Sequence, residues 1–212
     1  MLFSISDLTK QSAEKWIDKN INEVIHPGLK PDNFIKKPSN SNHIIYVGRL
    51  EKSKRVDVLI EALSKIKNHP KLIICGFGSQ KNSLINLATK LNVDFDYRGV
   101  VTEQEKWELI SSSLFMVFPT TFEGFGMPPM EALYCKKPCI TTDLKILKSN
   151  YGDYLEYVKV NDVDALSMKI KFLLDNPKYV RERGEKGRKF VLNKFNWEKS
   201  AELLEKSFES NR

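Results

Sequence analysis

Apolar residues in this chain alternate between short continuous runs and longer runs with helical spacing. The short runs predict strands buried on both faces of a sheet. The longer runs predict amphipathic helices, and the clearest of them places these apolar residues on one face: Val56, Leu59, Ile60, Leu63 and Ile66. The expected strands are residues 23–28, 43–47, 71–75, 93–97, 114–118, 138–141 and 154–158. The expected helices are residues 6–20, 55–66, 80–91, 102–112, 128–134, 162–174, 177–193 and 197–210.

This order of elements predicts the fold class. Strands that alternate with helices through short connections form an α/β fold, in which a Rossmann-like parallel sheet has helices on both faces. We divide the chain into residues 1–28, a polar linker rich in Pro and Asn at residues 29–42, a main domain at residues 43–196 and a last helix at residues 197–212. Ligands of such sheets bind beyond the carboxyl ends of the strands.

The charge of the chain suggests an anionic partner. Its 212 residues carry a formal net charge of +7, with a pI near 9.2. Nucleic acid, a nucleoside diphosphate or an acidic membrane surface would each fit, and so would a basic surface without a ligand. The lysines are dispersed over helices and do not gather in an aromatic-rich groove, so we do not expect nucleic acid as a partner.

The remaining composition limits cofactors and location. Cys75, Cys135 and Cys139 form no Cys-x-x-Cys pair, which indicates reduced thiols and a cytoplasmic protein. No apolar run reaches a membrane-spanning length and the start does not resemble a secretory signal, so we expect any membrane contact to be peripheral. The histidines are scattered and no Asp-x-Asp pair lies in a suitable loop. We therefore expect no metal and no other cofactor.

The most informative segment is residues 118–133, in which a buried strand leads through a Gly-rich loop into a helix that begins with two prolines. Glu123 is expected on the loop, and Glu131 in the first turn of the helix. The segment also predicts free backbone N–H groups facing an oxygen-rich ligand, at Phe125, Gly126 and Met127. This arrangement suits a polyol or a sugar phosphate.

Two motifs carry a family resemblance. The sequence EGFGMPPMEA, with Glu123 and Glu131, resembles the signature of the retaining glycosyltransferases of family four, which have the GT-B fold and use a nucleotide-activated sugar. The sequence YVGRLEKSKRVDVLIEA resembles their diphosphate-binding segment, with Gly48 at its turn and Arg49 and Lys54 at its basic positions. Arg55 stands where the family usually has Gly, which would either alter the turn or add a third charge.

The resemblance implies a role for each site residue. Glu123, Arg49 and Lys54 become the catalytic residues, with Glu123 beside the transferred sugar and the two cations on the diphosphate. Glu131 becomes the carboxylate that binds the ribose. The nucleotide pocket is lined by residues that follow the second and third strands of the main domain: Gly76, Gly78 and Val100. Backbone contacts read the base in this family, so the base, the sugar and the acceptor stay open.

The resemblance covers only the carboxyl-terminal, donor-binding half of a GT-B fold. Residues 1–28 resemble the last helix and strand of the amino-terminal half, and the helix at 197–212 is expected to return to them. The implied function is transfer of a sugar, with retention, from a nucleoside diphosphate sugar to an acceptor glycan or lipid-linked glycan. This reaction needs an amino-terminal domain or a partner chain. We expect it to take place free in the cytoplasm or at the inner face of a membrane. The alternative is a sugar-nucleotide-binding module without transfer activity; an epimerase or a phosphorylase fits the motifs less well.

Overall fold

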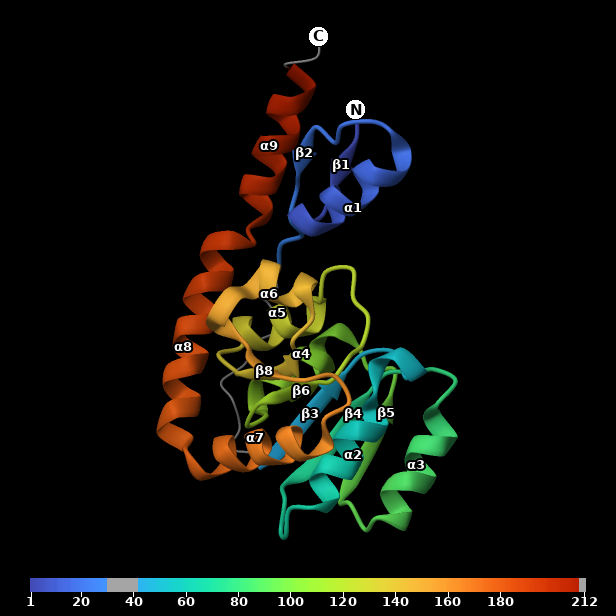
Figure 1. The fold of residues 1–212 in the computed structure, drawn as a ribbon. Helices are drawn as coiled ribbons and strands as arrows, with labels where there is room; N and C mark the ends of the chain where they lie inside the picture. Colours follow the sequence, from blue (N-terminus) through green and yellow to red (C-terminus); the bar gives the residue numbers. More distant parts are fainter. Residues whose placement is uncertain (30–41, 210–212) are drawn as a thin grey trace.

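The computed structural model describes residues 1–29 and 42–209, and its central feature is a parallel sheet. Within these residues the main sheet has six strands in the order β5-β4-β3-β6-β7-β8, and every pair is parallel (Figure 1). The strands are β3 (His43–Val47), β4 (Lys71–Cys75), β5 (Phe95–Gly99), β6 (Met116–Phe118), β7 (Cys139–Thr142) and β8 (Glu156–Val158). The predicted α/β fold class is confirmed.

Helices connect these strands and cover the sheet. They are α2 (Val56–Ser64), α3 (Lys81–Lys90), α4 (Glu103–Ser112), α5 (Met127–Tyr134), α6 (Lys145–Tyr151), α7 (Val163–Asp175) and α8 (Pro177–Lys194), with 3-10 turns η1 (Lys52–Lys54) and η2 (Gly152–Tyr154). Helix α2 packs against α3 and α7, whereas α5 packs against α4 and α8. Since the sheet grows in opposite directions from β3 and parallel crossovers are right-handed, the two groups cover opposite faces.

The sheet reverses its strand order between β3 and β6. From β3 the chain winds outward through β4 to β5, then returns to place β6 on the other side of β3 and winds outward again. Ile44, Ile45 and Tyr46 of β3 are fully buried, as the continuous apolar run predicted. The carboxyl ends of β3 and β6 therefore open at the switch point of the sheet, where ligands of doubly wound folds bind.

A smaller unit precedes the main sheet. Strands β1 (Phe3–Ser4) and β2 (Glu23–Val24) pair in parallel and are joined through α1 (Asp7–Ile17). The last helix, α9 (Trp197–Glu209), lies beside this unit (Figure 1). The rings of Phe3 and Phe208 are 6.2 Å apart, and Ser200 Oγ donates to the carbonyl of His26 at 2.7 Å. The expected return of the last helix to the start of the chain is confirmed; the domain boundaries themselves stay a prediction.

Sequence reasoning missed the short elements β1 and α6, and some of its predictions concern residues outside the described ranges. Strand β1 has only two residues, and the N-cap position of α6, Leu144, offers no side-chain hydrogen bond. The predicted strand at 93–97 is shifted to Phe95–Gly99, and the one at 114–118 begins only at Met116. Residues 30–41 of the predicted linker and residues 210–212 lie outside the described ranges.

Candidate functional site

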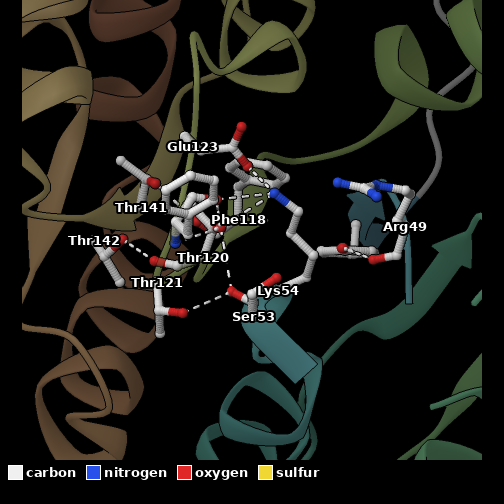
Figure 2. A network of polar contacts seen from close by, with 11 residues as sticks. Arg49, Ser53, Lys54, Phe118, Thr120, Thr121, Glu123, Thr141 and Thr142 are labelled. Carbon is white, nitrogen blue, oxygen red and sulfur yellow. Dashed lines mark hydrogen bonds and ion pairs between the residues drawn. The ribbon is translucent and has the colours of Figure 1, made fainter. Parts of the chain in front are cut away.

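Two loops meet at the switch point and are tied together by threonines (Figure 2). One loop, residues 48–55, follows β3, and the other, residues 119–126, follows β6. The carbonyl of Ser53 accepts from the backbone N–H of Thr121 at 2.7 Å, from Thr121 Oγ1 at 3.1 Å and from Thr120 Oγ1 at 3.3 Å. Thr142 of β7 donates its hydroxyl to the carbonyl of Thr120. The loops therefore form one supported surface.

Lys54 and Glu123 form an enclosed ion pair across these two loops. Lys54 Nζ donates to Glu123 Oε1, and also to the carbonyl of Phe122 at 3.1 Å and to Thr120 Oγ1 at 3.5 Å. Only 8% of the Lys54 side chain and 12% of the Glu123 side chain are exposed. The ammonium lies 5.6 Å from the centre of the Phe118 ring. The structure thus brings together two of the three predicted catalytic residues.

Arg49 stands beside this pair without joining it. Its side chain is exposed, and in the described part of the chain its guanidinium makes no hydrogen bond or ion pair. The backbone below it is fixed, because the hydroxyl of Tyr46 donates to the Arg49 carbonyl at 2.7 Å. Burial and the nearby Glu123 carboxylate raise the pKa of Tyr46, so this hydroxyl keeps its proton. The guanidinium fork is therefore available to an anion in solution.

Arg55 adopts the backbone conformation that a glycine would have. Its φ of 49° and ψ of 40° place it in the left-handed region, immediately before α2. Its Nη2 donates to Asp57 Oδ2 at 3.0 Å, and its Nη1 donates to Asn161 Oδ1. This conformation is one that Gly adopts readily, so the turn at this position does not require Gly; whether it differs from the turn of the family stays a prediction. The charge of Arg55 is directed to Asp57.

The loops after β3 and β4 touch through their backbones, which explains two predicted glycines. A Cβ atom on Gly76 would lie 1.8 Å from the carbonyl oxygen of Gly48, and one on Gly78 would lie 2.4 Å from the carbonyl oxygen of Leu50. The backbone N–H of Gly48 donates to the Cys75 carbonyl at 3.0 Å. Only residues without a side chain allow this approach. The contact holds the segment before Arg49 in place.

The signature loop leads into α5 with unused backbone donors. Gly126 precedes the helix with a φ of 92°, and the two prolines lie in the first turn as predicted. The carbonyls of the loop are occupied, since Asn150 donates to Phe125 at 2.9 Å and Tyr151 donates to Gly126 at 2.6 Å. In the described ranges, the backbone N–H groups of Phe125, Gly126 and Met127 donate to no protein acceptor. The side chain of Phe125 is buried, so this residue offers only its backbone.

Glu131 lies deeper in the helix than expected. It is the fifth residue of α5, and the first turn contains no acidic residue, so the predicted first-turn position is wrong. Its stabilising partner is Lys106 of α4, whose Nζ donates to Glu131 Oε1 at 2.9 Å. Burial raises the pKa of Glu131, and Lys106 opposes that shift. Sequence reasoning missed Lys106 because it lies 25 positions away on another helix.

The other predicted donor-site residue, Val100, directly follows β5 and is 73% exposed. It lies at the same carboxyl edge of the sheet as the loops above. Over the described ranges, no three His, Cys, Asp or Glu side chains are placed to hold a metal ion. In the same ranges, no helix combines the length and the apolar character needed to cross a membrane.

Comparison with known proteins gives this geometry a family. Residues 30–190 match the family model described as "Glycosyl transferases group 1". The chain belongs to the group 1 glycosyltransferases. An uncharacterised glycosyltransferase of Methanocaldococcus jannaschii is 29% identical over 201 residues, which are 91% of this chain and 56% of that protein. The lipopolysaccharide 1,6-galactosyltransferase of Escherichia coli K12 is 32% identical over 134 residues, or 59% of this chain and 37% of that protein.

Solved structures agree on the fold of this glycosyltransferase chain. HepE of Anabaena, solved with UDP-glucose, superposes with a TM-score of 0.88 at 15% identity, covering 99% of this chain and 64% of HepE. TarM of S. aureus, solved with UDP as a point variant, gives a TM-score of 0.83 at 22% identity, covering 94% of this chain and 42% of TarM. The chain thus spans about half of its relatives, and the likeness confirms one half of a GT-B fold.

Proposed function

We propose that this chain is the donor-binding half of a retaining glycosyltransferase. It binds a nucleoside diphosphate sugar, and the complete enzyme passes the sugar to an acceptor glycan or lipid-linked glycan in the cytoplasm or at the inner face of a membrane. The observation that carries the proposal is the enclosed Lys54–Glu123 pair, with exposed Arg49 beside it at the switch point of the sheet. Relatives of known activity are transferases, and solved neighbours were crystallised with UDP or UDP-glucose.

The chemistry follows from where charge develops. As the bond between sugar C1 and the diphosphate breaks, negative charge grows on the leaving phosphate and positive charge on the ring. Arg49, Lys54 and the free N–H groups before α5 stabilise the phosphate, which is the term that usually contributes most to such catalysis. Glu123 lies on the side of Lys54 away from Arg49 (Figure 2). There it stabilises the positive charge of the sugar ring or accepts a hydrogen bond from a sugar hydroxyl. Glu131 accepts hydrogen bonds from the ribose hydroxyls.

Replacing Arg49 with Ala tests the diphosphate site. We expect the affinity for UDP, ADP or GDP to fall about 10- to 100-fold, because one charge-assisted contact is lost. Affinity for the corresponding nucleoside should hardly change, since it has no phosphate. Isothermal titration calorimetry on the full chain measures both. Lys52→Ala, two residues before Lys54 in the same loop, is the control; equal losses for nucleoside and diphosphate would point to a folding defect.

The proposal includes departure of the diphosphate without a metal. Arg49, Lys54 and the N-terminus of α5 supply the positive charge that a divalent cation supplies in other transferases. Diphosphate binding by this chain, and transfer once an acceptor half is supplied, should persist in excess EDTA. Restoration of binding or transfer only by added Mg²⁺ or Mn²⁺ would overturn this part of the proposal.

The competing hypothesis is a sugar-nucleotide-binding module without transfer activity. The two candidates separate when the chain is supplied with an amino-terminal domain from a relative and incubated with a labelled sugar nucleotide. Release of the nucleoside diphosphate by the wild-type chain, together with no release by the Glu123→Gln variant, supports the transferase. Tight donor binding without any release supports the binding module.

A further inference from the structure

Glu131 forms an ion pair with Lys106, a residue that lies outside both sequence motifs. Lys106 comes from the second turn of α4, and its Nζ lies 2.9 Å from Glu131 Oε1 and 2.9 Å from Glu103. The exposed fraction of the Glu131 side chain is 9%, and that of Lys106 is 15%. A carboxylate enclosed to this degree needs a counter-charge to stay ionised.

The two oxygens of Glu131 differ in their surroundings. Oε1 accepts from Lys106, whereas no donor among the described residues contacts Oε2. Since every buried side-chain oxygen or nitrogen in these ranges has a hydrogen-bond partner, Oε2 reaches solvent. The lysine therefore occupies one side of the carboxylate and leaves the other side open to a ligand.

We infer that Lys106 is a positioning residue for the nucleotide: it fixes the orientation of the Glu131 carboxylate and keeps it ionised for the ribose hydroxyls. The inference rests on the proposed function. Lys106 itself does not touch the nucleotide. Its ammonium group is held in place, since it lies 5.2 Å from the centre of the Trp107 ring and the Trp107 side chain is buried. A pre-positioned carboxylate loses less entropy when a ligand binds.

The charged groups around Glu131 give this role a pH signature. Lys106 and Glu103 face it from α4; Cys135 of α5 and Tyr151 of α6 are also near. Burial raises the pKa of Cys135 to about 12 and that of Tyr151 well above its usual value, so both stay neutral near pH 7. Burial raises the pKa of Glu131 and Lys106 lowers it. Loss of Lys106 therefore leaves more of Glu131 protonated, most of all at low pH.

The experiment compares Lys106→Met with the wild-type chain in calorimetric titrations between about pH 5.5 and 8.5, a range that spans a raised carboxyl pKa. The probes are UDP, ADP and GDP, and the 2′,3′-dideoxy form of whichever binds best. We expect Lys106→Met to bind the ribonucleotide about 10- to 100-fold more weakly at the acid end, because protonated Glu131 loses its charge-assisted hydrogen bond to the ribose hydroxyls. The loss should shrink as the pH rises, and the dideoxy analogue should bind both proteins alike.

Matched variants separate positioning from folding. Glu103→Gln removes the other carboxylate on Lys106, so it should leave binding unchanged or slightly tighter at low pH. Lys106→Arg, which keeps the charge, should recover most of the affinity. If Lys106→Met does not fold, Lys106→Gln replaces it and should show the same pH-dependent loss.

Each outcome decides between the hypotheses. Equal ribonucleotide affinity of wild type and Lys106→Met at every pH, or a loss that is the same for the dideoxy analogue and independent of pH, overturns the role of Lys106 and leaves the proposed function standing. Failure of the wild-type chain to bind any of the three nucleotides overturns the proposed function, and the inference with it.

Discussion

Gly76→Ala is expected to lower the free energy of unfolding by about 3 kcal/mol or more, through overpacking and backbone strain together. The added Cβ would lie 1.8 Å from the carbonyl oxygen of Gly48, and Gly76 has a φ of 140°, which residues with a side chain rarely adopt. Neither the added Cβ atom nor the Gly48 oxygen can move aside easily, because each is attached to backbone that is held by the parallel strands β3 and β4. Urea denaturation followed by circular dichroism measures the change.

Gly124→Ala is the matched control for this prediction. No heavy atom lies within 4 Å of a Cβ atom placed on Gly124, and its φ is outside the strained range. We expect its stability to stay within about 0.5 kcal/mol of wild type. Equal stability of Gly76→Ala and Gly124→Ala would show that the loops after β3 and β4 do not meet as described.

Lys54→Met is expected to remove both stability and diphosphate binding. It leaves the enclosed carboxylate of Glu123 without its counter-charge, which should cost about 3–5 kcal/mol in unfolding free energy. Affinity for the nucleoside diphosphate should fall about 10- to 100-fold, since one charge-assisted contact to phosphate is lost. Chemical denaturation and calorimetric titration of the full chain measure the two effects.

A second substitution separates the two effects. Lys54→Met combined with Glu123→Gln has no unpaired charge, so its stability should return most of the way to wild type. Diphosphate binding should stay weak, because the phosphate ligand is still missing. Recovery of both stability and binding in the double variant would mean that Lys54 only neutralises Glu123 and has no role in binding the phosphate.

Sequence reasoning located the sheet and its helices well because their signals are local. The apolar run at β4 was predicted with its observed ends, since both faces of this strand are buried. Thr102 was predicted to begin a helix, and its hydroxyl accepts from the N–H of Glu105 at 3.2 Å. Helix α6 offers no cap at its start, and only tertiary packing around Leu147 and Tyr151 explains it.

The site was predictable as far as its residues lie within motifs. Arg49, Lys54 and Glu123 belong to two recognisable segments, and the structure pairs Lys54 with Glu123 at the switch point, with Arg49 beside them. Their roles in catalysis stay a prediction. The direct pairing of Lys54 with Glu123, and that of Lys106 with Glu131, depend on how β3, β6, α4 and α5 are arranged in space. No local pattern reports such contacts, which is why neither ion pair was predicted.

The unequal burial of Arg49 and Lys54 has a consequence for how an anion is captured. Mobile ions screen exposed charges over about 10 Å at an ionic strength of about 0.1 M, but they screen enclosed charges much less. Arg49 is open to the solvent, whereas only 8% of the Lys54 side chain is. If the proposed site binds a diphosphate, the salt dependence of association should therefore be set mainly by Arg49. In the proposed site, Lys54 would keep its contact with a bound phosphate even at high salt concentration.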